Sequence, residues 1–204
     1  MTLPDAPFTA STTRTATTTI TGSPTPSDAP PPRQTTVFTP DGPFTILELD
    51  GAVLASGWTS DLADLTGQIH PALRPATPPI VVDPAELGPI TAAVSAYYDG
   101  DIAAIDAVPV RQVSGPFRNH AWDMLRTVTP GHPVTYAQYA GLAGNASAVR
   151  AAAGACAKNA AALFVPCHRV IRTDGSLGGF RWGLEVKTSL LAREASHSAA
   201  VLAR

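Results

Sequence analysis

The chain has 204 residues, 45% of them apolar, which is enough to bury one good core or two small ones. Its formal net charge of -2 gives no global electrostatic reason to expect a nucleic-acid or membrane partner, so any basic surface has to be local. Two cysteines are too few for a disulfide framework, and polar residues interrupt every apolar run well before the length that crosses a bilayer.

The first 34 residues differ in composition from the rest of the chain. Threonine, serine, proline and alanine dominate them, and such a composition buries too little apolar area to offset the entropy of ordering. We therefore predict a disordered tail over residues 1–34. The tail lacks the patterns of a secretory or organelle-targeting signal, so we expect a reducing, cytoplasmic location and no membrane partner.

Residues 35–108 are predicted to form a small α+β domain. Runs of β-branched and aromatic residues at 37–38, 44–49 and 53–55 predict strands of an antiparallel sheet, the last two joined by a tight turn at Asp50 and Gly51. Residues 80–82 are expected to add an edge strand. Residues 85–98 have helical spacing of their apolar side chains, which predicts one helix.

Residues 109–196 are predicted to form a second, mostly helical domain, followed by a C-terminal tail over 197–204. A helix containing Phe117, Trp122 and Leu125 is expected to stop before Pro130. Residues 135–142 and the alanine-rich run 146–157 flank a break at Gly144, which predicts a helix-turn-helix. A last helix is expected over about 184–195.

The C-terminal part of the chain is locally basic. From residue 150 onward it carries eight basic residues against only Asp174, Glu185 and Glu194. The basic residues are Arg150, Lys158, Arg169, Arg172, Arg181, Lys187, Arg193 and Arg204. This clustering is typical of phosphate contact, although a solvated charged face has the same composition.

Cys167 stands between two apolar runs and directly before His168. A free thiol titrates near pH 8.5, so a nucleophile at neutral pH needs a base or a positive field beside it. His168 is a candidate base. A cysteine–histidine pair alone is also typical of structural positions. Cys156 is expected to be a small buried apolar residue, and its spacing to Cys167 and His168 does not fit a zinc site, so no metal is predicted.

The segment Pro166-Cys167-His168-Arg169-Val170 resembles the signature of the O6-alkylguanine-DNA alkyltransferases, also called methylated-DNA–protein-cysteine methyltransferases. Other positions match the family pattern independently. They are Tyr136, where the family has a tyrosine that contacts the substrate; Arg150, its intercalating arginine; Asn159, which braces the active-site turn; residues 175–183, its binding loop; and Glu194, its buried glutamate.

The resemblance implies a DNA-repair enzyme that acts once and needs no cofactor. Glu194 would orient His168, which through a water would take the proton of Cys167, and the thiolate would attack the alkyl carbon on O6 of guanine. Tyr136 would donate a hydrogen bond to the base and reduce the charge that develops on it. The alkyl thioether formed has no easy leaving group, so transfer is irreversible.

The resemblance also implies the partner and the fold. The partner would be double-stranded DNA carrying O6-alkylguanine, with O4-alkylthymine left open, bound through the minor groove by a monomer that flips the base out of the stack. Arg150, Ala148, Ala151 and Gly154 would contact DNA; Val170, Phe180, Arg181 and Lys187 would line the substrate pocket. The fold would be an RNase H-like α+β domain followed by a winged helix-turn-helix-like domain. Phe180 replaces a common tyrosine and Ala160 a common proline.

Three other functions fit parts of the pattern. A lesion-sensing or regulatory DNA-binding protein of the same fold would lack transfer activity, and the presence of Cys167 argues against it. A regulator that reads the major groove would carry polar side chains on its second helix, where alanines dominate here. A thiol hydrolase built on Cys167, His168 and Glu194 would turn over repeatedly.

Overall fold

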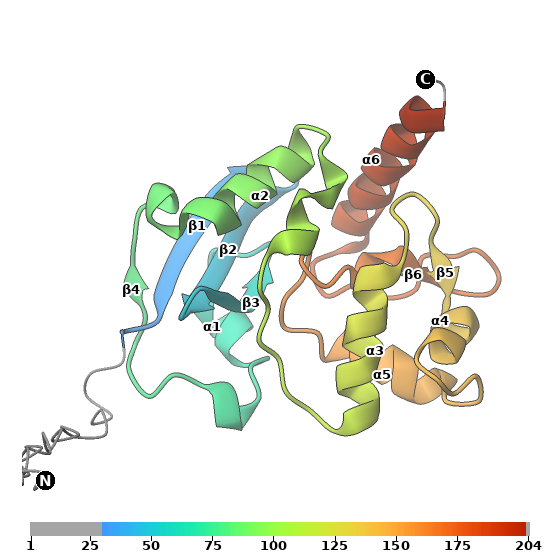
Figure 1. Ribbon diagram of the computed structural model, residues 1–204, viewed down its shortest axis with the longest axis horizontal. Helices are drawn as coiled ribbons and strands as arrows, with labels where there is room; N and C mark the ends of the chain where they lie inside the picture. The colour runs from blue at the N-terminus through green and yellow to red at the C-terminus, as the bar shows by residue number, and fades with distance from the viewer. Residues whose placement is uncertain (1–29, 203–204) are drawn as a thin grey trace, which may run out of the picture.

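The computed structural model describes residues 30–202, which form a small sheet covered by a helix beside a mostly helical region (Figure 1). The predicted α+β fold, with the sheet first and the helical portion second, is confirmed at this level. None of the helices within the described residues has the length and apolar character needed to span a bilayer.

The sheet has four strands in the order β3-β2-β1-β4. The strands are β1 (Arg33–Thr39), β2 (Gly42–Leu49), β3 (Ala52–Gly57) and β4 (Ile80–Val81). The predicted turn joins β2 to β3, with positive φ at both Asp50 (53°) and Gly51 (78°), as a tight hairpin between twisted strands requires. The first three strands are antiparallel, as expected.

Two sequence expectations for this part are wrong. The edge strand β4 pairs in parallel with β1, so the sheet is mixed rather than antiparallel, because the long connection after β3 brings the chain back in the direction of β1. The predicted tail also ends too late, since β1 begins at Arg33, whose guanidinium pairs with buried Glu48 at 2.7 Å. Residues 1–29 of that predicted tail lie outside the described residues.

Six α-helices and four short 3-10 turns complete the described part of the chain. The helices are α1 (Leu62–Thr66), α2 (Gly88–Tyr98), α3 (Pro116–Thr127), α4 (Tyr136–Leu142), α5 (Val149–Ala157) and α6 (Leu184–Leu202). The 3-10 turns are η1 (Pro71–Leu73), η2 (Pro84–Leu87), η3 (Ile102–Ala107) and η4 (Cys167–Arg169). Strands β5 (Val134–Thr135) and β6 (Val170–Ile171) pair in parallel.

Two helices have ends that differ from the sequence prediction, the alanine-rich helix at its start and the final helix at its end. The alanine-rich helix begins at Val149 rather than at 146, because Asn145 accepts the Ser147 N–H in a turn. Thr135 caps α4 through a capping box with Gln138. The final helix continues to Leu202, since no glycine or proline interrupts residues 184–202, so the predicted tail over 197–204 is wrong for residues 197–202.

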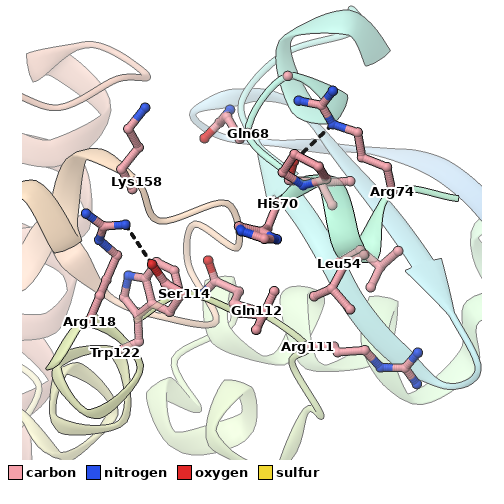
Figure 2. A pocket seen from close by; sticks show the side chains of 15 residues that line it. Leu54, Gln68, His70, Arg74, Arg111, Gln112, Ser114, Arg118, Trp122 and Lys158 are labelled. Atoms are coloured by element: carbon pink, nitrogen blue, oxygen red, sulfur yellow. Dashed lines mark hydrogen bonds between the residues drawn. The ribbon is translucent and has the colours of Figure 1, made fainter. Parts of the chain in front are cut away.

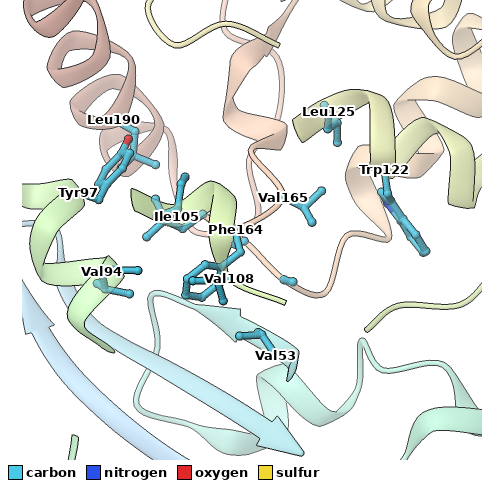
Figure 3. Packing of buried hydrophobic residues seen from close by; sticks show 14 of the residues in the cluster. Val53, Val94, Tyr97, Ile105, Val108, Trp122, Leu125, Phe164, Val165 and Leu190 are labelled. Atoms are coloured by element: carbon cyan, nitrogen blue, oxygen red, sulfur yellow. The ribbon is translucent and has the colours of Figure 1, made fainter. Parts of the chain in front are cut away.

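The main apolar core crosses the expected boundary near residue 108. Val94, Ile105 and Val108 pack in one cluster with Phe164, Val165 and Leu190 (Figure 3). The other labelled members are Val53, Tyr97, Trp122 and Leu125. Because the two predicted domains share this core, packing does not mark a boundary between residues 108 and 109, and the division stays a prediction from the sequence.

Strand β3 also fixes the chain that leads to Cys167. Ser56 donates its N–H to the Ala160 carbonyl and its hydroxyl to the Ala162 carbonyl, both at 2.8 Å, and accepts the Ala162 N–H at 3.2 Å. Val53 donates to the Pro109 carbonyl at 2.9 Å. The edge of the sheet thus holds the backbone of residues 160–162 in place, five residues before the cysteine.

Candidate active site

Cys167 lies at the start of η4, where it is half-buried and forms part of the wall of a cavity of about 510 Å³. This volume falls in the range of small-molecule pockets, roughly 300–1,000 Å³. The lining residues are Tyr136, Ala153, Cys156, Ala157, Asn159, Cys167, Gly179, Phe180, Arg181 and Trp182. Cys167 therefore borders a cavity large enough for a small molecule.

Asn159 holds the sulfur and the turn before it. Its side-chain N–H₂ donates to the Val165 carbonyl at 2.7 Å and to Cys167 Sγ at 3.3 Å. Gln112, which the sequence analysis missed, fixes the orientation of this amide: it donates to Asn159 Oδ1 at 3.1 Å and accepts the Ala160 N–H at 2.8 Å. Gln112 stands in a loop without a motif, so no local pattern marks it.

His168 and Glu194 meet in the interior, 26 residues apart in the chain. His168 Nε2 lies 2.9 Å from Glu194 Oε1, and both side chains are fully buried. Tyr97 of α2 donates to the same carboxylate oxygen at 3.0 Å, and Arg169 donates to both carboxylate oxygens at 3.0–3.2 Å. The second ring nitrogen, Nδ1, contacts no polar partner within residues 30–202.

The charges of this buried group follow from its contacts. Burial alone would raise the pKa of Glu194, but hydrogen bonds and charges from His168 and the permanently charged Arg169 outweigh it and lower that pKa to about 2. Burial lowers the pKa of His168 despite the neighbouring carboxylate. At neutral pH the structure therefore holds an ionised glutamate and a neutral imidazole, which is the form that can accept a proton.

The thiol of Cys167 is a weaker acid than a free cysteine. Burial raises its pKa, although the Asn159 hydrogen bond and the positive charges of Lys187 and Arg181 oppose the shift. The positive charges of Lys187 and Arg181 therefore lower the pKa of Cys167 by less than burial raises it. Sγ has no direct hydrogen bond to His168 among the described residues, so a proton leaving the thiol needs a bridging group to reach the imidazole.

Tyr136 and the binding loop form part of the wall of the cavity. Tyr136 is half-buried at the start of α4, and Gly178 lies so close that a side chain there would come within 3.2 Å of the tyrosine hydroxyl. Burial raises the pKa of Tyr136, which keeps the hydroxyl protonated and able to donate. Phe180 lines the same wall and packs on Trp58 at 6.1 Å between ring centroids.

Two residues expected in the substrate pocket do not line the cavity. Val170 and Lys187 are both fully buried. Lys187 faces inward from α6 and donates to the carbonyls of Val170 (2.6 Å) and Leu177. A buried ammonium group needs hydrogen-bond acceptors. By donating to Leu177, Lys187 ties the binding loop to α6 on the interior side of the loop. Arg181 does line the cavity, with its guanidinium 3.3 Å from the Ala157 carbonyl.

The residues expected to contact DNA lie on α5, except for Ala148, which is its N-cap. Arg150 is exposed at the beginning of this helix and makes no hydrogen bond or ion pair with any described residue. Ala151 is also exposed, and Ala148 and Gly154 are half-buried.

Cys156 was expected to be buried but is half-buried, and it lines the cavity because its face of α5 is turned toward the binding loop. Over the described residues no cluster of acidic, cysteine and histidine side chains could hold a metal.

Gly57→Ala tests the packing of the binding loop on the sheet. A Cβ at position 57 would lie 2.0 Å from Cζ2 of Trp182, so the indole has to move. We expect the free energy of unfolding to fall by about 1–3 kcal/mol, as overpacking typically costs. Gly154→Ala is the control, because its Cβ meets nothing within 4 Å in a helix and is expected to stabilise by about 0.5–1 kcal/mol. Equal denaturant midpoints for the two variants would contradict the close packing of Trp182 against Gly57.

The comparisons with known proteins agree with one another. Residues 116–196 match the family model described as 6-O-methylguanine DNA methyltransferase, DNA binding domain. The bifunctional transcriptional activator/DNA repair enzyme Ada of Escherichia coli is 49% identical over 81 residues, which are 40% of this chain and 23% of that protein. The chain thus spans less than a quarter of that relative.

Two further matches extend over most of the chain. The methylated-DNA–protein-cysteine methyltransferase of Mus musculus is 34% identical over 166 residues, 76% of this chain and 78% of the relative. A crystal structure of a variant of the Mycobacterium tuberculosis O6-methylguanine methyltransferase superposes with a TM-score of 0.66 at 26% identity, covering 81% of this chain and 94% of that one. The similarity therefore includes both the sheet and the helical region.

Proposed function

Because the chain belongs to the O6-methylguanine-DNA methyltransferase family, we propose that it repairs DNA by transferring an alkyl group from O6 of guanine to Cys167 Sγ. One observation carries the proposal: the half-buried sulfur lines a cavity of about 510 Å³, directly next to a neutral, buried histidine paired with a glutamate. A structural cysteine needs neither the cavity nor the base.

In the proposed reaction one bond forms and one breaks. The Sγ–carbon bond forms as the carbon–O6 bond breaks, and the electron pair of the broken bond stays on the purine. The thiol proton passes through a water to His168 and finally replaces the alkyl group on the purine. Glu194 positions His168 and stabilises its charged form. Tyr136, protonated and at the cavity wall, donates to the base as negative charge develops.

The chemistry explains why each molecule would act once. The product on Cys167 is a neutral thioether, which offers water no leaving group comparable to that of a thioester. No cofactor takes part in this scheme. A labelled methyl group offered on duplex DNA is expected to move to the protein until each chain holds one, whereas continued release of product would indicate a hydrolase.

The proposed partner is double-stranded DNA, from which the damaged nucleotide has to be rotated out of the stack. Rotation costs a few kcal/mol, which a side chain filling the vacated space can offset. Arg150 is exposed and unpaired among the described residues, and the small side chains at 148, 151 and 154 allow α5 to approach a narrow groove closely. We infer that a monomer binds through the minor groove.

Arg150→Ala is expected to slow transfer from duplex DNA by roughly 10–100-fold, the equivalent of about 1–3 kcal/mol of lost base extrusion. The rate is measured by single-turnover transfer from a duplex and from a free O6-alkylguanine base, which needs no extrusion. Arg126→Ala, on α3, is the charge-matched control. An unchanged ratio of the duplex rate to the free-base rate in the Arg150 variant would contradict the assignment.

A further inference from the structure

A second cavity, of about 270 Å³, lies between the segment that follows α1 and the beginning of α3 (Figure 2). Four cationic side chains and no acidic ones line it. The cationic residues are Arg74, Arg111, Arg118 and Lys158. We call this cavity the basic groove.

The positive charge of the basic groove is largely uncompensated. Arg118 donates Nη1 to Ser114 Oγ at 2.7 Å, and its buried Nε has no partner within the described part of the chain. Arg74 donates to a backbone carbonyl. Among the described residues, Arg111 lies 3.6 Å from the carboxylate of Asp50, and because these two side chains are 41% and 47% exposed, the pair is weak.

The dipole of helix α3 adds to the positive electrostatic potential of the basic groove. Helix α3 begins at Pro116, two residues after Ser114, and the positive end of its dipole lies beside the basic groove. In Figure 2, Lys158 and Arg118 stand on one side of the cavity and His70 and Arg74 on the other. An anion held between these two sides would lie in the positive field of Arg118, Lys158 and Arg74, which suits a phosphate group.

The basic groove is a neighbour of the reactive cavity. Lys158 directly follows Ala157, which lines the cavity of Cys167, and Gln112 lines the groove while donating to Asn159. Lys158 also stands at the opposite end of α5 from Arg150. Eight residues of helix separate them by about 12 Å, or between three and four base-pair steps of about 3.4 Å.

We propose that the basic groove binds a backbone phosphate of the DNA strand that flanks the lesion, an inference that rests on the proposed function. A strand seated along α5, with its damaged base in the cavity of Cys167, continues past Lys158 into the groove. The contact positions the duplex and increases affinity without reading sequence, and it takes no part in the alkyl transfer.

The test is the salt dependence of DNA binding. Each neutralised phosphate contributes about 0.9 to the slope of log K against log salt, so Lys158→Gln and Arg118→Gln are each expected to reduce the slope by about 0.9 and to weaken binding about fivefold at 0.15 M salt. Arg126→Gln, two turns further along α3, removes the same charge outside the basic groove and is expected to leave the slope unchanged.

The outcomes separate this inference from the proposed function. Wild-type protein that transfers alkyl groups from duplex DNA, together with unchanged slopes in both groove variants, would overturn the phosphate contact and leave the repair function standing. Absence of transfer from any duplex would defeat the proposed function itself. Inorganic phosphate, added at constant ionic strength, is the small-anion probe: if it stabilises the wild type but not Arg118→Gln while DNA affinities stay equal, the groove binds free anions and not DNA.

Discussion

Cys167→Ala is expected to abolish alkyl transfer completely, both from duplex DNA and from a free O6-alkylguanine base. The reason is that the proposed route assigns the thioether to Cys167 Sγ, whose residue is adjacent to His168; the other sulfur at the cavity wall belongs to Cys156. Its stability should change little, since the side chain is half-buried and makes one weak hydrogen bond to Asn159. Transfer is measured with a labelled alkyl group and stability by thermal unfolding.

Cys156→Ala is the matched control for that result. Cys156 lines the same cavity, but burial raises the pKa of its thiol well above the ordinary value, and no hydrogen bond joins it to Asn159. This variant is expected to keep one alkyl acceptor per chain. Loss of labelling in Cys156→Ala with retention in Cys167→Ala would reverse the assignment of the nucleophile.

Glu194→Gln is expected to have the largest effect on stability. The substitution leaves the guanidinium of Arg169 buried without its counter-charge, and breaking one partner of a buried pair typically costs about 3–5 kcal/mol. His168 also loses its acceptor, so transfer slows in whatever protein still folds. Glu185→Gln, exposed on the first turn of α6, is the control and should change stability by less than about 0.5 kcal/mol.

The same carboxylate gives the wild type a pH dependence. The pKa of Glu194 falls from an ordinary 4.5 to about 2 in the folded protein, which corresponds to about 3 kcal/mol. Because the folded pKa is the lower one, this stability is fully present above about pH 4.5 and is lost as the pH falls toward 2. Denaturant unfolding of the wild type should show this loss, and a loss of equal size in Glu194→Gln would contradict it.

Local patterns predicted the elements that local forces determine. The turn at Asp50 and Gly51, the strands on either side of it, and the break between α4 and α5 all depend on residues within a few positions of one another. The motif around Cys167 likewise singled out the cysteine that lines the cavity and the histidine that pairs with Glu194. These features needed no knowledge of which distant segments meet.

Long-range contacts account for what the sequence analysis missed. Tyr97 reaches Glu194 across 97 positions and Gln112 reaches Asn159 across 47, and nothing in their immediate neighbourhoods marks either contact. The inward orientation of Lys187 depends on carbonyls supplied by two other segments. The direction of β4 depends on the path of a long connection. The family resemblance could name residues, but it could not reveal these partners.

The raised pKa of Cys167 means that its thiol is protonated at neutral pH and has to lose its proton before it can act as a nucleophile. A free thiolate at rest would react with any electrophile that entered the cavity. A thiol held in its protonated form beside a neutral imidazole instead becomes nucleophilic when its proton has somewhere to go. Under the proposed function, such a site would favour reaction with a substrate that is already bound.

The most direct measurement is peptide mass spectrometry after titration with duplex DNA carrying O6-methylguanine. We expect the peptide containing Cys167 to gain a single methyl group, the peptide containing Cys156 to gain none, and uptake to stop at one methyl per chain. Methylation of another residue, or product formation that continues beyond one equivalent, would contradict this expectation.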